Sequence, residues 1–348
     1  MGETKLRCGV IGLGMGKAHI RGYQAHPNCE VVAVCDLDEE RLAKAKDEFG
    51  IPAVYSDVDA MLAAEKLDIV SIATPNKLHK PFTLAAAKAG AHVLCEKPIA
   101  MNVAEAREMQ AAVEAAGKRL MINFSYRFNA ASQALKRLVD TGVLGNVYTA
   151  RTCWLRRFGF PGFGGWFSNT AMSGGGPLID LGVHRIDLAL WLMGYPEPDV
   201  VLASATDVLT KAECERQGKE ANTENHAAGF IRFKNGASLQ VEASWACHRA
   251  EDEFMETHLY GDKAGLVQKN VGGGYNFTAE LFETRAGALY TTEIGRTIEP
   301  AKSAMECFAD AILNDEPTPA PAEQGIIVQQ ILDGLYESAA TGKPVTVE

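Results

Sequence analysis

Short apolar runs alternate with amphipathic, helix-like segments between Leu6 and about Leu120. This alternation is typical of βαβ units, in which helices connect parallel strands. The predicted strands are Leu6–Ile11, Val31–Cys35, Ile69–Ala73, His92–Leu94 and Leu120–Ile122, and the predicted helices are Lys17–His26, Glu39–Phe49, Lys80–Ala89 and Ala104–Ala116. Gly50, Gly90 and Gly117 follow three of these helices, where a left-handed C-terminal cap is expected. We therefore predict a parallel α/β sheet in the first part of the chain.

The pattern changes after about Phe124. Two helix-like stretches, Ala131–Asp140 and Leu178–Leu192, flank a loop rich in glycine and aromatic residues, Phe158–Gly176. Strand patterns follow at Val200–Leu209, Asn225–Phe233, Ser238–Ala246 and Glu256–Tyr260, with an Asn-Gly turn in Lys234–Ala237, and the tail returns to helix at Ala301–Leu313 and Glu323–Ala339. We predict two domains, residues 1–124 and residues 125–348, the second with α+β organisation and an antiparallel meander.

Composition narrows the partners and the compartment. With 47% hydrophobic residues, the 348-residue chain can fill two cores. No stretch approaches about 18 uncharged apolar residues, so we expect no membrane span, and the first residues lack signal-peptide features, which favours a cytoplasmic protein. The net charge of −10 offers no basic face to nucleic acid. The eight cysteines are scattered without metal-ligand spacing, so no metal is predicted and small molecules are the expected partners.

Three glycines directly follow the first predicted strand, in Gly12-Leu13-Gly14-Met15-Gly16. Between a strand and a helix, such a loop can hold a pyrophosphate with its backbone N–H groups and the helix N-terminus. The third glycine comes one position earlier than in the G-x-G-x-x-G fingerprint, and Lys17 takes the sixth position. We predict a Rossmann dinucleotide site in which Gly12 to Gly16 contact the cofactor.

Asp36 ends the second predicted strand, 24 residues after Gly12 (36 − 12 = 24). A carboxylate at this position can accept hydrogen bonds from the adenosine ribose hydroxyls. It would repel the 2′-phosphate of NADP by up to about 4 kcal/mol at about 4 Å, which favours NAD over NADP. Asp36, Leu37 and Arg41 complete the predicted adenosine end of the site, although an arginine near this carboxylate could compensate a phosphate.

Two further segments resemble the Gfo/Idh/MocA family of glucose-fructose oxidoreductases and inositol dehydrogenases, Asp68 to His79 and Ala89 to Pro98, the latter ending in Cys-Glu-Lys-Pro. The run Gly-Gly-Gly-Pro-Leu-Ile-Asp-Leu-Gly-Val-His from Gly174 to His184 and the ending Ser338 to Val345 also fit. The resemblance implies a Rossmann domain followed by an α+β domain with a large, mostly antiparallel open sheet. Because that sheet commonly mediates oligomers, a homodimer or homotetramer is expected.

The resemblance also implies roles for single residues. Thr74, Asn76 and His79 would line the cofactor, Glu96 would hold the nicotinamide ribose, and Lys97 would contact both the cofactor and the reacting substrate oxygen. Independently of the family, a lysine that precedes a proline at a strand end has an extended, restricted backbone, which suits a positioned cation.

Asp180 and His184 are the second predicted catalytic group. They are four residues apart on a predicted helix, so both side chains share a face and can act on one substrate. Oxidation of a carbinol requires loss of the hydroxyl proton, and histidine titrates near neutral pH, so His184 is the predicted general base. Asp180 would hold a substrate hydroxyl or orient the imidazole, while Lys97 stabilises alkoxide charge. Asp187, one turn further on, could be mistaken for the partner of His184, but the spacing of Asp180 matches the family motif.

Arg127 and Trp166 complete the predicted site. The family usually shows an arginine near the cleft where Arg127 stands, and we expect it to contact cofactor and substrate. Trp166 lies in the glycine-aromatic loop and is expected to wall the substrate. For both residues, a structural role in a salt bridge or in packing stays open. The neighbouring Arg156 and Arg157 could contact an anionic or highly hydroxylated substrate, or form a surface charge pair.

These features predict an NAD(H)-dependent oxidoreductase that transfers hydride between nicotinamide and a carbinol or keto carbon of a sugar, cyclitol or related polyol. One alternative is a family member that uses tightly bound NAD in a redox-neutral elimination or hydrolysis of a sugar derivative. Another is a non-catalytic NAD-binding regulatory protein, against which stands the joint presence of Lys97, Asp180 and His184.

Overall fold

The chain forms two compact units in a computed structural model that describes residues 5–294 and 300–347. The first unit comprises Met1–Phe124 and Lys302–Ile326, and the second comprises Ser125–Ala301 and Ile327–Glu348. Residues 1–4, 295–299 and 348, which the two predicted domains include, lie outside the described residues.

The first unit is built on a parallel sheet with the strand order β3-β2-β1-β4-β5-β6. Its strands are β1 (Leu6–Ile11), β2 (Cys29–Cys35), β3 (Ala53–Tyr55), β4 (Ile69–Ile72), β5 (His92–Cys95) and β6 (Leu120–Ile122). The central strands are almost entirely buried, as expected for a parallel sheet covered on both faces. The predicted Rossmann sheet is confirmed.

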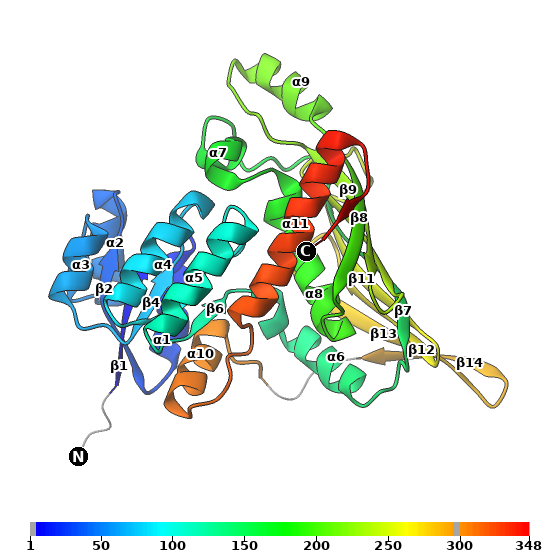
Figure 1. Ribbon diagram of the computed structural model, residues 1–348, viewed down its shortest axis with the longest axis horizontal. Coiled ribbons are helices and arrows are strands. Elements are labelled where there is room, and N and C mark those ends of the chain that lie inside the picture. Colours follow the sequence, from blue (N-terminus) through cyan, green and yellow to red (C-terminus); the bar gives the residue numbers. More distant parts are fainter. Residues whose placement is uncertain (1–4, 295–299, 348) are drawn as a thin grey trace. The chain divides into compact units, whose positions relative to one another are not determined.

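Helices of the first unit connect these strands (Figure 1). They are α1 (Gly16–Ala25), α2 (Glu39–Phe49), α3 (Val58–Ala64), η1 (Asn76–Leu78), α4 (His79–Lys88), α5 (Val103–Ala115) and α10 (Ala304–Leu313). Side chains of Asp38, Asp57 and Asn102 cap the N-termini of α2, α3 and α5, which satisfies backbone donors that the helix leaves open. Gly50 adopts the predicted left-handed cap after α2, with φ of 67°.

The segment Lys302–Ile326 belongs to the first unit, whereas the predicted boundary had assigned it to the second. A capping box between Ser303 and Glu306 starts α10, which packs against α1 so closely that a Cβ at Gly22 would lie 2.6 Å from the Met305 side chain. The Ile122 backbone N–H donates to the Ala320 carbonyl at 2.9 Å. These contacts are long-range in sequence, so a pattern read along the chain does not reveal them.

The second unit contains a mixed, mostly antiparallel sheet with the order β14-β13-β12-β11-β7-β10-β9-β8-β15 among the described residues. Its strands are β7 (Val147–Arg156), β8 (Pro198–Thr206), β9 (His226–Phe233), β10 (Ser238–Ser244), β11 (Glu253–Gly261), β12 (Ala264–Asn270), β13 (Phe277–Arg285), β14 (Ala288–Ile294) and β15 (Val345–Thr346). Only the β7–β10 pair is parallel in this part of the described structure. The predicted fold class is thus confirmed in both units.

Helical segments of the second unit are η2 (Ser125–Phe128), α6 (Ala130–Asp140), η3 (Trp166–Ser168), α7 (Thr170–Ser173), η4 (Leu178–Gly182), α8 (Val183–Met193) and α9 (Val208–Gln217). Helix α11 (Ala322–Thr341) starts in the first unit and continues through the second. Nine of the eleven residues of α8 are buried, because this helix packs on β7, β10 and β11.

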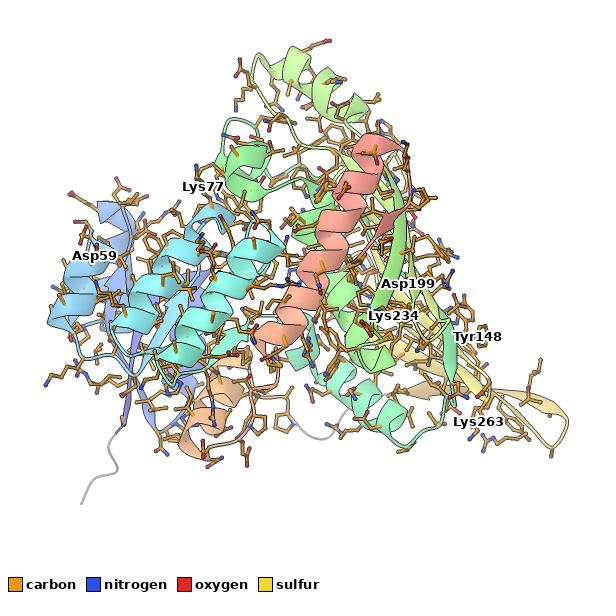
Figure 2. All side chains as sticks on the ribbon, in the orientation of Figure 1. Asp59, Lys77, Tyr148, Asp199, Lys234 and Lys263 are labelled. Atoms are coloured by element: carbon orange, nitrogen blue, oxygen red, sulfur yellow. The ribbon has the colours of Figure 1, made fainter. Side chains whose placement is uncertain are left out.

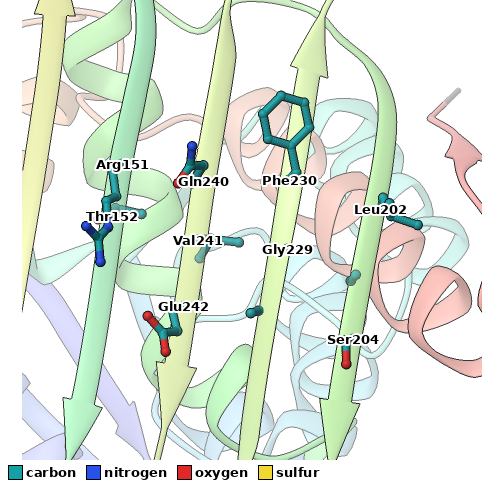
Figure 3. A pocket seen from close by; sticks show the side chains of 11 residues that line it. Arg151, Thr152, Leu202, Ser204, Gly229, Phe230, Gln240, Val241 and Glu242 are labelled. Carbon is teal, nitrogen blue, oxygen red and sulfur yellow. The ribbon is translucent and has the colours of Figure 1, made fainter.

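One face of the large sheet carries a hollow of about 540 Å³, lined by residues of β7, β10, β9 and β8 (Figure 3). Leu202 and Phe230 project on this face and are 46% and 41% exposed. Leu202 and Phe230 are register partners on β8 and β9, so their exposed apolar side chains lie side by side. Tyr148, near the start of β7, is also exposed, at 57% (Figure 2).

Candidate active site

The glycine loop between β1 and α1 gives each of its glycines a separate role. Gly12 has φ of +87°, and a Cβ there would lie 2.4 Å from the Ala73 carbonyl oxygen, so only glycine lets β1 and β4 ends approach. A Cβ at Gly16 would lie 2.9 Å from Val10, since α1 packs tightly on β1. Gly14 has no atom within 4 Å of its Cβ position, which leaves open space above the loop. The shortened fingerprint thus keeps the tight turn at Gly12 and the close helix–strand packing at Gly16 of the longer one, with open space over Gly14.

Asp36 lies directly after β2, and its carboxylate is fixed against the glycine loop. Oδ2 accepts from the Leu13 backbone N–H at 2.6 Å, and Oδ1 accepts from the Asp38 N–H at 2.9 Å. Leu37, at 87%, and Met15, at 61%, are strongly exposed. The Arg41 Nε pairs with Asp38 Oδ2 at 3.2 Å. The residues predicted for the adenosine end therefore lie on the loop after β2 and in the first turn of α2.

The loop after β4 carries Thr74, Asn76 and His79. The Thr74 hydroxyl is buried and has no hydrogen-bond partner among the described residues, so a ligand could use it. Asn76 is buried in η1, while the adjacent Lys77 is exposed (Figure 2).

His79 is fully buried at the start of α4. Its Nδ1 lies 2.8 Å from the Pro98 carbonyl and its Nε2 lies 3.0 Å from the Thr74 carbonyl. Burial lowers the pKa of His79, although both carbonyls act in the opposite direction. Both ring nitrogens are thus engaged by the backbone. His79 therefore links the loops that follow β4 and β5, and its contact with the cofactor stays a prediction.

Glu96 follows β5 and forms a buried polar cluster with two residues that the sequence did not single out. Its Oε1 accepts from His19 Nε2 at 2.9 Å and from Asn123 Nδ2 at 2.7 Å, and Oε2 accepts from the Lys97 backbone N–H at 3.2 Å. Burial alone would raise the pKa of Glu96, but the hydrogen bonds and charges of His19, Lys97 and Asn123 hold it at about 2. The carboxylate is therefore ionised and fixed beside Lys97.

Asp180 lies in a π-helical turn, η4, that runs directly into α8, and His184 is the second residue of α8. π segments often occur at functional sites. Asp180 Oδ2 accepts from the Trp245 indole N–H at 3.1 Å. The His184 ring, 9% exposed, packs edge-on against Tyr126, with centroids 5.1 Å apart, and lies 5.9 Å from Trp154.

A buried carboxylate holds the start of this turn. Glu224 accepts from the backbone N–H groups of Gly176, at 2.7 Å, and Leu178, at 3.1 Å. The Tyr336 hydroxyl donates to Glu224 at 2.9 Å and accepts from the Ile179 N–H at 3.2 Å. These contacts satisfy donors that a helix N-terminus leaves open, and the negative charge suits that end of the helix.

The same contacts explain the glycine run before the turn. A Cβ at Gly175 would lie 2.1 Å from the Tyr336 hydroxyl, and a Cβ at Gly176 would lie 2.3 Å from the Glu224 carbonyl oxygen. Larger residues would therefore push Glu224 and Tyr336 away from the backbone that carries Asp180 and His184.

Two comparisons of the sequence give the family. Residues 6–124 match an oxidoreductase family described as an NAD-binding Rossmann fold, and residues 136–347 match the C-terminal alpha/beta domain of that family, Gfo/Idh/MocA. The chain belongs to this family. The resemblance seen in the motifs is confirmed, and so is the prediction of an oxidoreductase.

Relatives with named activities extend this result. The Escherichia coli (strain K12) D-glucoside 3-dehydrogenase is 37% identical over 99% of this chain and 98% of its own length. The D-xylose 1-dehydrogenase (NADP(+)) 2 of Haloferax volcanii is 30% identical over 98% of both chains. A levoglucosan dehydrogenase solved in complex with NADH superposes with a TM-score of 0.86 at 25% identity, covering 99% of this chain and 100% of the other. Membership of the Gfo/Idh/MocA family therefore indicates a nicotinamide cofactor, and the named relatives are dehydrogenases of sugars.

Arg127 takes part in a buried ion pair in this Gfo/Idh/MocA protein, and its contact with cofactor and substrate stays a prediction. Its guanidinium is 1% exposed and makes a bidentate pair with Asp187, with Nε to Oδ2 at 2.9 Å and Nη2 to Oδ1 at 2.5 Å, and it also contacts Tyr195. Burial acts to lower the pKa of Arg127, but Asp187 and Tyr195 raise it above its ordinary value. The salt-bridge alternative is thus what the structure shows, and Asp187 is the partner of Arg127.

Trp166 begins η3 in the glycine-aromatic loop and stacks on Phe167, with ring centroids 3.7 Å apart. Arg157 is a surface residue, 58% exposed in its side chain, with Asp252 4.0 Å away. Its neighbour Arg156 has a different environment, which includes Asp180. Arg156 is the last residue of β7 and Arg157 follows the strand, so the two arginines have different surroundings.

Sequence reasoning missed His19, Asn123, Glu224 and Tyr336. His19 lies one turn into α1, and its spacing from the glycine loop could have indicated a residue near the cofactor. Glu224 and Tyr336 are 48 and 157 residues from their backbone partners Gly176 and Ile179. These groups come together only in the three-dimensional structure, so no local sequence pattern predicts their contacts.

No group of three or more histidine, cysteine or acidic side chains within residues 5–294 and 300–347 is arranged to hold a metal ion. In the same part of the chain, no helix is both long enough and apolar enough to cross a membrane.

Proposed function

We propose that this protein is an NAD(H)-dependent dehydrogenase or reductase that transfers hydride between nicotinamide and a carbinol or keto carbon of a sugar, cyclitol or related polyol. The observation that supports this most is the continuous segment of η4 and α8 that carries Asp180 and His184, whose start is held by Glu224 and Tyr336. A proton-transfer pair on a braced helix suits carbinol oxidation, and membership of a nicotinamide oxidoreductase family supplies the redox half of the reaction.

Residues of the first unit fit a dinucleotide. The open space over Gly14, the carboxylate of Asp36 and the buried, unused hydroxyl of Thr74 are features that the pyrophosphate, the adenosine ribose and the nicotinamide end could occupy. Glu96 would hold the nicotinamide ribose. When bound, the nicotinamide supplies the acceptor or donor of the hydride.

The protein's own groups handle the proton and the charge of the substrate oxygen. In oxidation, His184 accepts the hydroxyl proton and Lys97 stabilises the negative charge that develops on the oxygen. Asp180 accepts a hydrogen bond from a neighbouring substrate hydroxyl or orients the imidazole. In reduction, His184 returns the proton to the same oxygen.

We propose NAD rather than NADP as the preferred cofactor. Asp36 places a carboxylate where a 2′-phosphate would be repelled. Arg41, the residue that could compensate that phosphate, pairs with Asp38.

A second copy of the chain is the proposed partner of the hollow sheet face, in a homodimer or homotetramer. Leu202 and Phe230 expose apolar surface there, and a self-complementary contact across a two-fold axis would cover it.

The test is a kinetic panel with purified protein. We expect NAD reduction, followed by NADH absorbance, with D-glucosides first and then with xylose, levoglucosan and inositol. Substrate consumption without net NADH would indicate the redox-neutral mode instead. Neither NADH formation nor substrate consumption with any sugar or polyol would contradict the proposal.

A further inference from the structure

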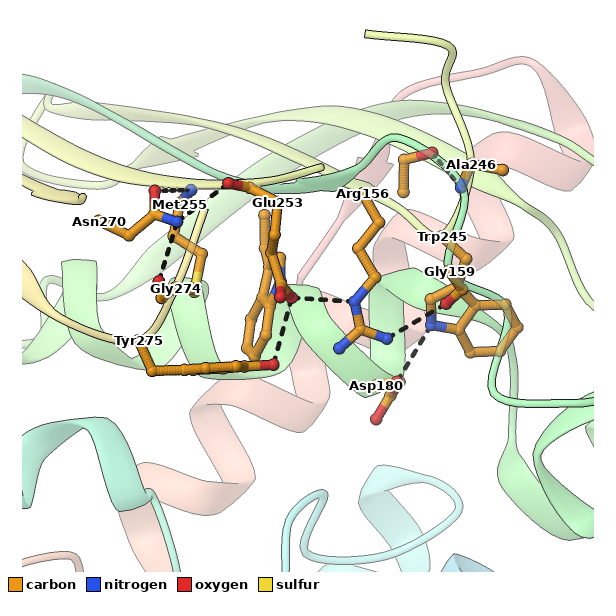
Figure 4. Close-up of polar contacts among 12 residues, drawn as sticks. Arg156, Gly159, Asp180, Trp245, Ala246, Glu253, Met255, Asn270, Gly274 and Tyr275 are labelled. Carbon is orange, nitrogen blue, oxygen red and sulfur yellow. Dashed lines mark hydrogen bonds and ion pairs between the residues drawn. The ribbon is translucent and has the colours of Figure 1, made fainter. Parts of the chain in front are cut away.

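A second polar cluster lies beside Asp180 in the second unit, and the proton chemistry does not use it (Figure 4). Its centre is Glu253, the first residue of β11. Arg156 Nε donates to Glu253 Oε1 at 2.9 Å, the Trp154 indole N–H donates to the same oxygen at 2.6 Å, and the Tyr275 hydroxyl does so at 3.3 Å. Three donors on one carboxylate oxygen fix this side chain firmly.

The second carboxylate oxygen of Glu253, Oε2, receives no donor from the part of the chain that the structure describes. The side chain nevertheless keeps 15% of its surface exposed. A carboxylate oxygen that is held in place and still reachable is well suited to accept a hydrogen bond from a ligand hydroxyl.

Arg156 links this cluster to Asp180. Its guanidinium is also held by the Gly159 carbonyl at 3.3 Å and lies over the Trp154 ring, 5.6 Å from the centroid. Burial acts to lower the pKa of Arg156, but the Glu253 and Asp180 carboxylates raise it above its ordinary value. The arginine therefore stays charged and its charge is already matched by these carboxylates.

The charge balance of the cluster decides which ligands fit. Asp180 and Glu253 contribute two negative charges, and Arg156 contributes one positive charge. The fully buried Arg185 adds one more guanidinium, although burial lowers its pKa to about 10. The two guanidinium groups of this cluster therefore do not exceed its two carboxylates, so these described side chains offer no surplus positive charge to a substrate carboxylate or phosphate.

The aromatic side chains complete the chemistry. Trp154 and Tyr275 meet edge to face, with ring centroids 6.1 Å apart, and the Trp245 indole lies against Asp180. Aromatic rings offer an apolar surface to the C–H face of a sugar, and the carboxylates to which their N–H and O–H groups donate offer acceptors to its hydroxyls.

We propose that Glu253, Arg156 and Tyr275 form a subsite for the part of the sugar away from the reacting carbon, and that it selects uncharged, hydroxyl-bearing sugars over sugar acids and sugar phosphates. This inference rests on the proposed function, since it names the substrate class of the same site. The sequence left open whether Arg156 contacts an anionic or a highly hydroxylated substrate, and the proposed subsite favours the highly hydroxylated substrate.

The experiment compares two sugars that differ only at carbon 6, methyl D-glucopyranoside and methyl D-glucuronopyranoside. We expect kcat/KM of the wild-type protein to favour the uncharged glucoside by about tenfold or more. Glu253→Gln keeps the size of the side chain and an acceptor for Arg156 but removes one negative charge, and should reduce this preference about tenfold. Glu197→Gln removes the same charge from an exposed ion pair with Lys234 and should leave the preference unchanged.

Wild-type preference for the glucuronide, or an unchanged ratio in Glu253→Gln, would overturn the proposal. If Glu253→Gln does not fold, as judged by circular dichroism, Arg156→Gln replaces it, because loss of the cation should strengthen discrimination against the glucuronide. An unchanged or weakened discrimination in that variant would equally overturn the subsite.

Calorimetric titration of both sugars in the presence of NADH separates this inference from the proposed function. Selective binding of the glucoside without any turnover would support the subsite and contradict the dehydrogenase. Turnover with equal binding of both sugars would support the dehydrogenase and contradict the subsite.

Discussion

His184 lies among aromatic rings, and its position tests the acid–base assignment directly. Removal of the imidazole by His184→Ala should lower kcat by at least about 10²-fold, the lower range for a lost general base. NADH binding, followed by its fluorescence, should stay the same because the residue belongs to the second unit. Unchanged turnover would remove His184 from the mechanism.

Asp36 tests the choice of cofactor. Asp36→Asn keeps an oxygen acceptor for the Leu13 N–H but removes the charge that repels a 2′-phosphate. We expect kcat/KM with NADP relative to NAD to rise about tenfold or more, less than the unscreened limit because Asp36 is only half-buried. Asp59→Asn, an exposed carboxylate in α3, is the matched control (Figure 2). Faster turnover of wild-type protein with NADP than with NAD at equal concentration would contradict the proposed preference.

Substitution of Arg127 tests whether this residue stabilises the fold or contacts a ligand. Arg127→Ala would leave the Asp187 carboxylate buried without its partner, which should cost about 3–5 kcal/mol of the free energy of unfolding. We expect a lower melting temperature and a lower urea midpoint, with KM values close to those of the wild type. Arg157→Ala, on the surface, should change neither property. A raised KM for NAD or sugar at normal stability would instead restore the role predicted from the sequence.

The turn η4 tests whether catalysis depends on a backbone brace. Glu224→Gln replaces one acceptor oxygen by an amide N–H that cannot accept from Gly176 or Leu178. Because a small displacement of catalytic groups is costly, we expect kcat to fall about tenfold while KM for NAD stays unchanged. The pH dependence of kcat should also shift, since His184 belongs to the helix that this brace begins.

Two further variants control this experiment. Tyr336→Phe removes one hydroxyl from the same network and should give a smaller loss of kcat. Glu337→Gln, exposed on the next position of α11, should behave as wild type. Normal kcat and an unchanged pH profile in Glu224→Gln would show that the turn does not need this carboxylate.

Elements with a strong local pattern were predictable. All five predicted strands of the first sheet exist, because buried parallel strands read as continuous apolar runs. The hairpin between β9 and β10 turns at Gly236, with φ of +86°, as the Asn-Gly pair predicts. The helix predicted over Leu178–Leu192 is observed as η4 followed by α8.

Other elements lack such a pattern. β14 is exposed along nearly its whole length, so no apolar alternation marks it. β3 has only three half-buried residues, and β7 carries arginines within a central strand. The end of the strand predicted at Val200–Leu209 is instead the start of α9, because the Asn225 side chain accepts from the Leu209 N–H there.

Some residues of the candidate site could likewise be predicted from local sequence patterns, and others could not. The glycine loop, Asp36, Glu96 and Lys97 follow strand ends, where chain order and the sheet edge together indicate a ligand site. The supporting residues His19, Glu224 and Glu253 act through partners between 48 and 99 residues away. Their roles depend on strand order and register in three dimensions, which motifs along the chain do not encode.

At the scale of the whole molecule, the hollow sheet face tests self-association. Phe230→Asp places a charge on this face, and burial of an unpaired charge in an interface is strongly unfavourable. We expect wild-type protein to elute as a dimer or tetramer in size-exclusion chromatography with light scattering, and the variant to dissociate. Lys263→Asp, an exposed residue between β11 and β12, is the control (Figure 2). A monomeric wild-type protein would contradict the proposed partner.

The Lys302–Ile326 segment has a consequence for how the chain acquires its structure during synthesis. The strand β6 and helix α1 need partners that are translated 198 and 283 residues later, Ala320 for Ile122 (320 − 122 = 198) and Met305 for Gly22 (305 − 22 = 283). The nucleotide-binding unit therefore cannot be complete when its own first 124 residues leave the ribosome, contrary to the usual N-terminal-first order of domain folding. A truncated chain that stops before residue 302 should expose the apolar faces of α1 and β6 to chaperones and proteases, even though every glycine-loop residue is present.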